Sequence, residues 1–227
     1  MTVETMPRSA TVRRVTGYAG FTALALLAAG QGLIQVGGAE PPFDAPTRDI
    51  VEFFATRDAE FFAAGSYLSV LSVITMLWFL GGLYTLLRED WRAPIAFLSG
   101  VVYVATTVFG GWELAAFRVA EGLDPQIARL TFDMGNMAFA SAWVALGSFA
   151  LATGWAVLST RLFPPWLGWW AVIAGVCLVA ARAVWTTQFW LAGFTLFWIW
   201  VIALCVVLLR QRSTASTGSG SGVHSRP

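Results

Sequence analysis

The chain contains no lysine, a single histidine and two cysteines, and only 12% of its 227 residues are charged. A soluble domain carries about 25% charged residues, so this composition is not that of an ordinary water-soluble protein. The 14 arginines are balanced by 13 acidic residues. This near-neutral balance argues against nucleic acid as a partner, because binding a nucleic-acid backbone needs an extended basic face. A lysine-free sequence rich in Ala, Gly and Trp is typical of GC-rich bacterial genomes.

The scarcity of histidine and cysteine also limits the chemistry. His224 stands in a Ser-, Thr- and Gly-rich C-terminal segment, so no pair of histidines can hold haem or zinc. Walker, GxSxG, HExxH and CxxC motifs are all absent. Cys177 and Cys205 fall at depths about 10 Å apart, too far for a disulfide, and we interpret both as core residues. We predict no catalytic residue, cofactor or metal, although catalysis by paired carboxylates stays open.

Long apolar segments are abundant. The mean hydropathy is +0.68 and 57% of the residues are apolar, and about 20 apolar residues suffice to cross a hydrocarbon core about 30 Å thick. We predict an all-α polytopic membrane protein, with a cytoplasmic tail at residues 1–15 and a disordered cytoplasmic tail at 210–227. A cleaved signal peptide is the competing interpretation of the first segment, which is longer than signal sequences require. The six predicted spans are residues 16–39, 65–87, 93–117, 132–158, 166–185 and 189–209.

The segments between the predicted spans contain helix-breaking and helix-capping residues. Three prolines between residues 41 and 46 forbid a helix there. The apolar and charged residues that follow, up to residue 62, alternate near helical spacing. This pattern predicts an amphipathic helix, capped by Asp44 or Thr47, that lies at the membrane surface; a solvated connector is the alternative. Asp124 is predicted to cap a short turn through Arg129, and Gly110 and Gly111 to bend the third span. Close helix packing is predicted at Gly81 with Gly82, Ala28 with Gly32, and Gly147 with Gly154.

The arginines predict the orientation. With the N-terminus in the cytoplasm, nine arginines lie on the cytoplasmic side and five outside, in agreement with the positive-inside rule. Tryptophans near the span ends are typical of interfacial belts, including Trp112, Trp185 and Trp190 at the outer edge. We therefore expect a multi-pass protein of the bacterial cytoplasmic membrane with both termini inside.

Several polar residues fall at a similar depth near the outer ends of the spans. Charged groups in membrane spans are costly and tend to be paired or functional. One interpretation is a ligand-binding pocket in the outer leaflet. In it Arg182 is an anion or headgroup anchor, Glu113 or Asp133 is its counter-charge, and Trp112 and Trp185 are walls. The other is an ion pair or hydrogen-bonded network that holds spans together. The residues of this predicted polar layer are Gln35, Glu113, Asp133, Asn136 and Arg182.

The segment Arg161-Leu-Phe-Pro-Pro-Trp-Leu-Gly-Trp-Trp170, followed by Ala174-Gly175, carries a family resemblance. It resembles the short cytoplasmic turn and following span of an uncharacterised six-span bacterial membrane family, common in actinobacteria. Asp133-Met-Gly135 and Leu146-Gly147 extend the resemblance over about the last half of the chain. Pro165 stands where that family often has Arg. The resemblance implies six spans and transfers no catalytic residue.

Three functions are compatible with this sequence. The first is a non-enzymatic accessory or binding protein for a lipid or small amphiphile, with membrane lipids or another membrane protein as partners. The second is a small transporter, which the apolar middle of the predicted spans disfavours. The third is a lipid-modifying enzyme that uses Glu113 or Asp133 as acid or base.

Overall fold

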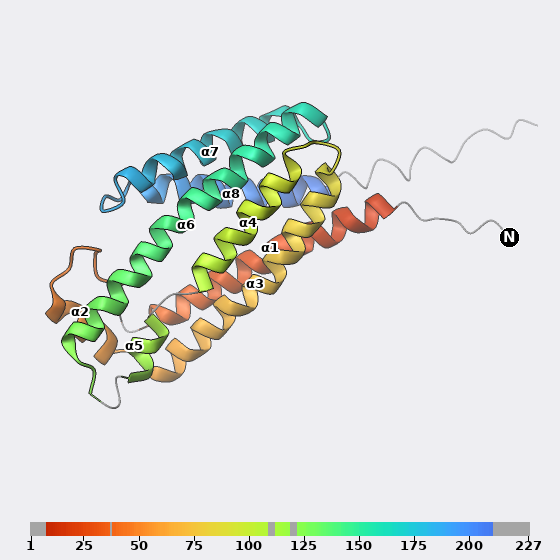
Figure 1. Ribbon diagram of the computed structural model, residues 1–227. Helices are drawn as coiled ribbons and strands as arrows, with labels where there is room; N and C mark the ends of the chain where they lie inside the picture. The colour runs from red at the N-terminus through yellow and green to blue at the C-terminus, as the bar shows by residue number, and fades with distance from the viewer. Residues whose placement is uncertain (1–7, 37, 109–111, 119–121, 211–227) are drawn as a thin grey trace, which may run out of the picture.

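The computed structural model describes residues 8–36, 38–108, 112–118 and 122–210, and within these ranges every regular element is a helix (Figure 1). The chain is therefore all-helical, as predicted. The helices are α1 (Arg8–Ile34), α2 (Thr47–Ala55), α3 (Ala59–Leu87), α4 (Ala93–Val108), α5 (Trp112–Arg118), α6 (Pro125–Thr160), α7 (Pro165–Ala183) and α8 (Phe189–Arg210).

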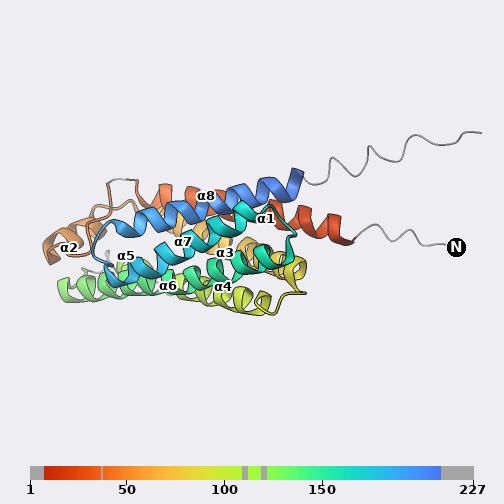
Figure 2. The ribbon, with the colours of Figure 1, turned by 90° about the horizontal axis from the view of Figure 1, so that it is seen from above.

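The longer helices lie side by side in an elongated bundle (Figures 1 and 2). Around the bundle, α1 packs on α3, α3 on α4, α4 on α6, α6 on α7 and α7 on α8, and α8 returns to α1. The short helices α2 and α5 lie at one end, whereas α1 begins and α8 ends at the other. We call these the α2/α5 end and the terminal end.

Among the residues that the structure describes, five helices are long and apolar enough to cross a membrane: α1, α3, α6, α7 and α8. The predicted third span differs, because residues 93–117 are shared between α4, an apolar helix of 16 residues, and the separate α5. At 1.5 Å per residue α4 is about 24 Å long, less than a hydrocarbon core of about 30 Å. The glycines expected to bend this span, Gly110 and Gly111, lie outside the described residues.

The structure changes the bounds of three other spans. α3 begins at Ala59, six residues before the predicted start and inside the stretch expected to belong to the surface helix. α1 begins at Arg8, inside the segment expected as a tail, and ends at Ile34. α6 begins at Pro125 and has 36 residues, so the short turn expected before span four is instead the first part of one helix about 54 Å long. Asp124 caps this helix as predicted: its carboxylate accepts hydrogen bonds from the backbone N–H groups of Gln126 (2.7 Å) and Ile127 (3.3 Å).

The helix predicted after the prolines forms, but its cap and its surroundings differ from the prediction. α2 begins after Pro46, with no side-chain cap from Asp44 or Thr47. Its apolar face does not need a bilayer, because protein covers it. Ile50, Phe53 and Phe54 are buried in a small core that Ala115 of α5 and Ala128 and Phe132 of α6 complete.

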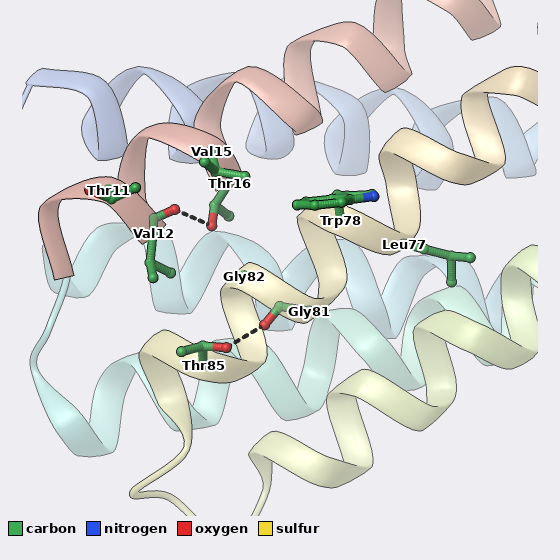
Figure 3. Close-up of a pocket in the computed structure, with 9 residues that line it drawn as sticks. All are labelled: Thr11, Val12, Val15, Thr16, Leu77, Trp78, Gly81, Gly82 and Thr85. Atoms are coloured by element: carbon green, nitrogen blue, oxygen red, sulfur yellow. Dashed lines mark hydrogen bonds between the residues drawn. The ribbon is translucent and has the colours of Figure 1, made fainter. Parts of the chain in front are cut away.

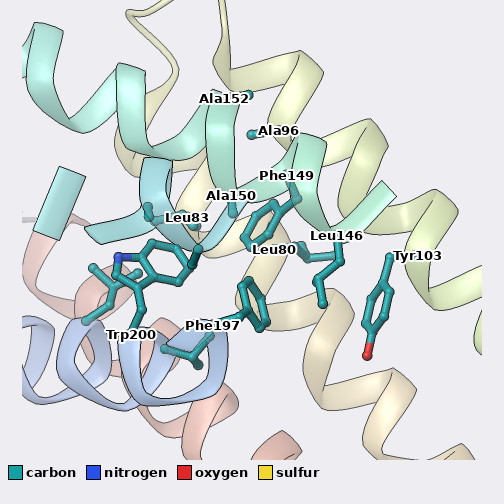
Figure 4. Close-up of a cluster of buried hydrophobic side chains, with 14 of the residues drawn as sticks. Leu80, Leu83, Ala96, Tyr103, Leu146, Phe149, Ala150, Ala152, Phe197 and Trp200 are labelled. Atoms are coloured by element: carbon teal, nitrogen blue, oxygen red, sulfur yellow. The ribbon is translucent and has the colours of Figure 1, made fainter. Parts of the chain in front are cut away.

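The main core lies between α3, α4, α6, α7 and α8, where aromatic and aliphatic side chains such as Phe149, Phe197 and Trp200 interlock (Figure 4). Close helix contact depends on glycine. A Cβ at Gly147 would lie 2.9 Å from the carbonyl oxygen of Gly175, and one at Gly154 would lie 2.7 Å from that of Gly168, so α6 and α7 touch backbone to backbone.

Among the other glycines expected to allow close packing, Gly82 abuts Thr16 of α1, but Gly32 and Gly81 face open space. On α1, Gly30 packs against Gly65 of α3, and Gly20 packs against the ring of Phe79 of α3. Both cysteines are free, and Cys205 is buried.

Candidate functional site

The five residues of the predicted polar layer belong to segments that meet at the α2/α5 end. Gln35 follows α1, Glu113 lies in α5, Asp133 and Asn136 lie in α6, and Arg182 lies in the last turn of α7. The residues of the predicted polar layer therefore share one end of the bundle.

Asp133 is not the counter-charge of Arg182. Its carboxylate binds Arg129 one turn earlier on α6, with 2.9 Å between Arg129 Nε and Asp133 Oδ2. The same guanidinium donates a 2.6 Å hydrogen bond to the carbonyl oxygen of Ala45 and so ties α6 to the segment before α2. Arg182 is half-buried and forms no ion pair with the residues that the structure describes.

The remaining predicted residues lie in different surroundings. Gln35 is exposed to solvent or lipid. Asn136 is 2% exposed, and its amide nitrogen has no hydrogen-bond partner among the described residues. The backbone of Glu113 is helical, whereas its side chain is not described.

The outer tryptophans are packing residues rather than pocket walls. Trp112 stacks on Phe132, with ring centroids 5.6 Å apart and planes inclined by 5°. Trp185 and Trp190 both stack with Phe43 from the loop between α1 and α2, at 5.6 and 6.3 Å. Phe43 therefore holds that loop against the α7–α8 hairpin.

The same loop contains a half-buried carboxyl group, Glu40, that the sequence analysis did not select. Burial raises the pKa of Glu40 from 4.5 to about 7, and the positive charge of Arg57 only partly offsets this rise. Burial in turn lowers the pKa of Arg57. Pro41 and Pro42 follow Glu40 and mark it as a loop residue, but no local pattern indicates that it is covered.

Arg57 links three elements at this place. Its guanidinium donates hydrogen bonds to the carbonyl oxygens of Ile34 (2.8 Å) and Val36 (3.2 Å), which α1 leaves without helical partners at its C-terminal end. It also lies 4.1 Å from the centre of the Phe53 ring of α2. The Nε atom is buried and has no partner among the described residues.

A second polar cluster lies at the terminal end, in the turn between α3 and α4. Asp90 is 7% exposed and accepts hydrogen bonds from Ser159 of α6 (2.7 Å) and from the backbone N–H of Arg92 (2.9 Å), whose guanidinium also pairs with it (3.1 Å). Burial acts to raise the pKa of Asp90, but these hydrogen bonds and the charge of Arg92 together lower it. The cluster fixes the α3–α4 turn to α6.

The described surface is hollowed along the junction of α1 and α3. A groove of about 490 Å³ lies there, lined by nine residues from residues 11–16 of α1 and 77–85 of α3 (Figure 3). A smaller groove of about 380 Å³ shares Val15 and Trp78 with it and continues along both helices through Tyr18 and Thr22 to Ile74. We call the two together the α1/α3 furrow.

The furrow is apolar in effect although threonines line it. Thr16 Oγ1 donates to the carbonyl oxygen of Val12 at 2.7 Å, and Thr85 Oγ1 donates to that of Gly81 at 2.8 Å. Both hydroxyl hydrogens are therefore used within the helices. Trp78, which is 64% exposed, forms one wall, and Gly81 leaves the floor open.

In the described part of the chain, no three His, Cys, Asp or Glu side chains lie close enough together to hold a metal ion. The arrangement offers an apolar surface groove, two polar clusters that join helices, and one carboxyl group with a raised pKa. No protein-family model matches the chain, and no curated protein or solved structure matches it either.

Proposed function

We propose that this chain is a six-span protein of the bacterial cytoplasmic membrane that binds the hydrocarbon chain of a membrane lipid or small amphiphile and acts without catalysis. Both termini would lie in the cytoplasm, as the arginine bias predicts. An even number of crossings is supported by α1 beginning and α8 ending at the same end of the bundle.

In this proposal α4 is the sixth crossing. It packs between α3 and α6 and is apolar, although it is shorter than the others. α6 exceeds a hydrocarbon core by about 24 Å, so its first turns reach beyond the bilayer. There α2 and α5 cover them, which supports an interfacial position for α2 as part of a folded cap.

The observation that carries the proposed function is the α1/α3 furrow. It extends over residues 11–22 of α1 and 74–85 of α3. At 1.5 Å per residue this is about 16 Å, about half of the hydrocarbon core and so the depth of one leaflet. A groove of that length, in which the hydroxyls of Thr16, Thr75 and Thr85 donate to backbone carbonyls of their own helices, fits an acyl chain better than a polar solute.

Binding accounts for the structure better than transport does. Transporters commonly bind their substrate at helices that are interrupted near the middle of the membrane. Here α1, α3, α6, α7 and α8 are each continuous, and the interior between them is filled by apolar side chains. The polar clusters lie near the bundle ends instead.

The test is to fill the furrow. A Cβ at Gly81 meets no atom within 4 Å, so Gly81→Leu places its side chain in the groove without a clash inside the protein. Gly32→Leu is the matched control, because Gly32 also faces open space but does not line the furrow. We expect native mass spectrometry to show lipid adducts on the wild type and on Gly32→Leu, and few on Gly81→Leu. Equal adducts on all three proteins would refute the proposal.

A further inference from the structure

We infer that the occupant of the α1/α3 furrow is an anionic phospholipid whose phosphate lies between Arg14 and Arg88. This inference rests on the proposed function and adds the chemistry of the headgroup. It depends on the charge and the freedom of the side chains where the furrow reaches the terminal end.

The terminal end is positively charged. Six arginines with described side chains stand there against two acidic residues, and one of the two, Asp90, is buried and paired with Arg92. Basic clusters next to a membrane surface attract anionic lipids. The arginines are Arg13, Arg14, Arg88, Arg92, Arg161 and Arg210.

Arg14 and Arg88 are the arginines closest in sequence to the furrow lining that are also free to bind. Arg14 precedes Val15 directly, and Arg88 follows Thr85 by about one turn. Both are exposed, and neither forms a hydrogen bond or ion pair with the residues that the structure describes. Arg13, in contrast, lies against the ring of Phe163 at 6.0 Å.

A phosphate suits these two side chains. The planar guanidinium donates two parallel hydrogen bonds to phosphate oxygens, and the long arginine stem lets the charge reach the interface from a position within the hydrocarbon. Glu89 is exposed beside Arg88 and opposes an anion. Removing the charge of Glu89 should therefore strengthen the preference for anionic lipid that the arginines create.

The experiment compares two lipids with identical acyl chains, phosphatidylglycerol and phosphatidylcholine, offered in equal amounts to the delipidated full chain and measured by native mass spectrometry. We expect the wild type to prefer phosphatidylglycerol, and Arg14→Gln and Arg88→Gln each to reduce the preference about fivefold. Glu89→Gln should raise it. Arg161→Gln, which removes a charge from the α6–α7 turn outside the furrow, should leave it unchanged.

The outcomes separate this inference from the proposed function. One outcome is that Gly81→Leu removes both lipids but the arginine variants keep the wild-type ratio of phosphatidylglycerol to phosphatidylcholine. The proposed acyl-chain site is then supported and the headgroup inference is wrong. If Gly81→Leu changes nothing, both are wrong. A third outcome would overturn the inference: the wild type carries no lipid and is a dimer, whereas Gly81→Leu is a monomer. That result would show that a second copy of the chain occupies the furrow.

Discussion

The raised pKa of Glu40 predicts that the protein loses stability between pH 5 and pH 8. The folded chain holds the proton of this carboxyl group up to about pH 7, whereas an unfolded chain releases it near the ordinary value of 4.5. Below pH 4.5 both states are protonated and the difference vanishes. As the pH rises from 4.5 to 7, only the unfolded state loses its proton, so the free energy of unfolding falls and then levels off.

The size of the effect follows from the shift. A pKa difference of one unit corresponds to about 1.4 kcal/mol, so the rise from 4.5 to about 7 gives an upper limit of about 3 kcal/mol. For a chain of this length, 1 kcal/mol moves the melting temperature by about 2–4 °C. We expect the melting temperature of the wild type to be several degrees lower at pH 8 than at pH 5.

Thermal unfolding in detergent, followed by tryptophan fluorescence at pH 5 and pH 8, measures this difference. Glu40→Gln cannot ionise and should remove most of it, with its largest gain over the wild type at pH 8. Asp44→Asn is the control, since Asp44 is exposed in the same loop and carries the same charge. A wild type and a Glu40→Gln variant with the same pH dependence would refute the reasoning.

Three further predictions concern the stability of the helix bundle, and melting temperatures in detergent check all of them. Asp90→Ala leaves Ser159 and Arg92 without their acceptor and should destabilise the protein by about 2–3 kcal/mol, whereas Ser159→Ala should cost less. Gly175→Val forces α6 and α7 apart and should lower the melting temperature strongly, whereas Gly32→Ala should be neutral or slightly stabilising. Asp124→Ala removes the cap of α6 and should cost about 1 kcal/mol, whereas Asp124→Asn should retain most of the stability.

The parts of the fold that depend on residues close together in the sequence were predictable. The apolar segments gave the positions of the long helices, Asp124 marked the start of a helix, and Gly147 and Gly154 marked a close contact, because each depends on spacing along the chain. The pairing of Arg129 with Asp133 also lay within reach, since the two stand one helical turn apart. A local pair of this kind forms more readily than the pairing with Arg182 that equal depth alone indicated.

The parts that depend on contacts between distant segments were not predictable. The apolar face of α2 gave the same pattern whether it met lipid or protein, and only the presence of Phe132 and Ala115 beside it decides between them. The burial of Glu40 depends on how its loop is held across α1 and the α7–α8 hairpin. The furrow depends on the distance between α1 and α3, which no residue of either helix encodes alone.

The use of arginine in place of lysine has a structural reason at the α2/α5 end. Arg57 and Arg129 each serve backbone carbonyl oxygens and a second group at once: the ring of Phe53 for Arg57, and the carboxylate of Asp133 for Arg129. A guanidinium carries five donors in one plane and two flat faces, so it can bind several partners from one position, which a lysine ammonium does less well. At the terminal end the exposed arginines have no such partners among the described residues apart from those already named. Arginine therefore fixes loops where protein surrounds it, and we propose that at the terminal end the same side chain binds an anionic headgroup.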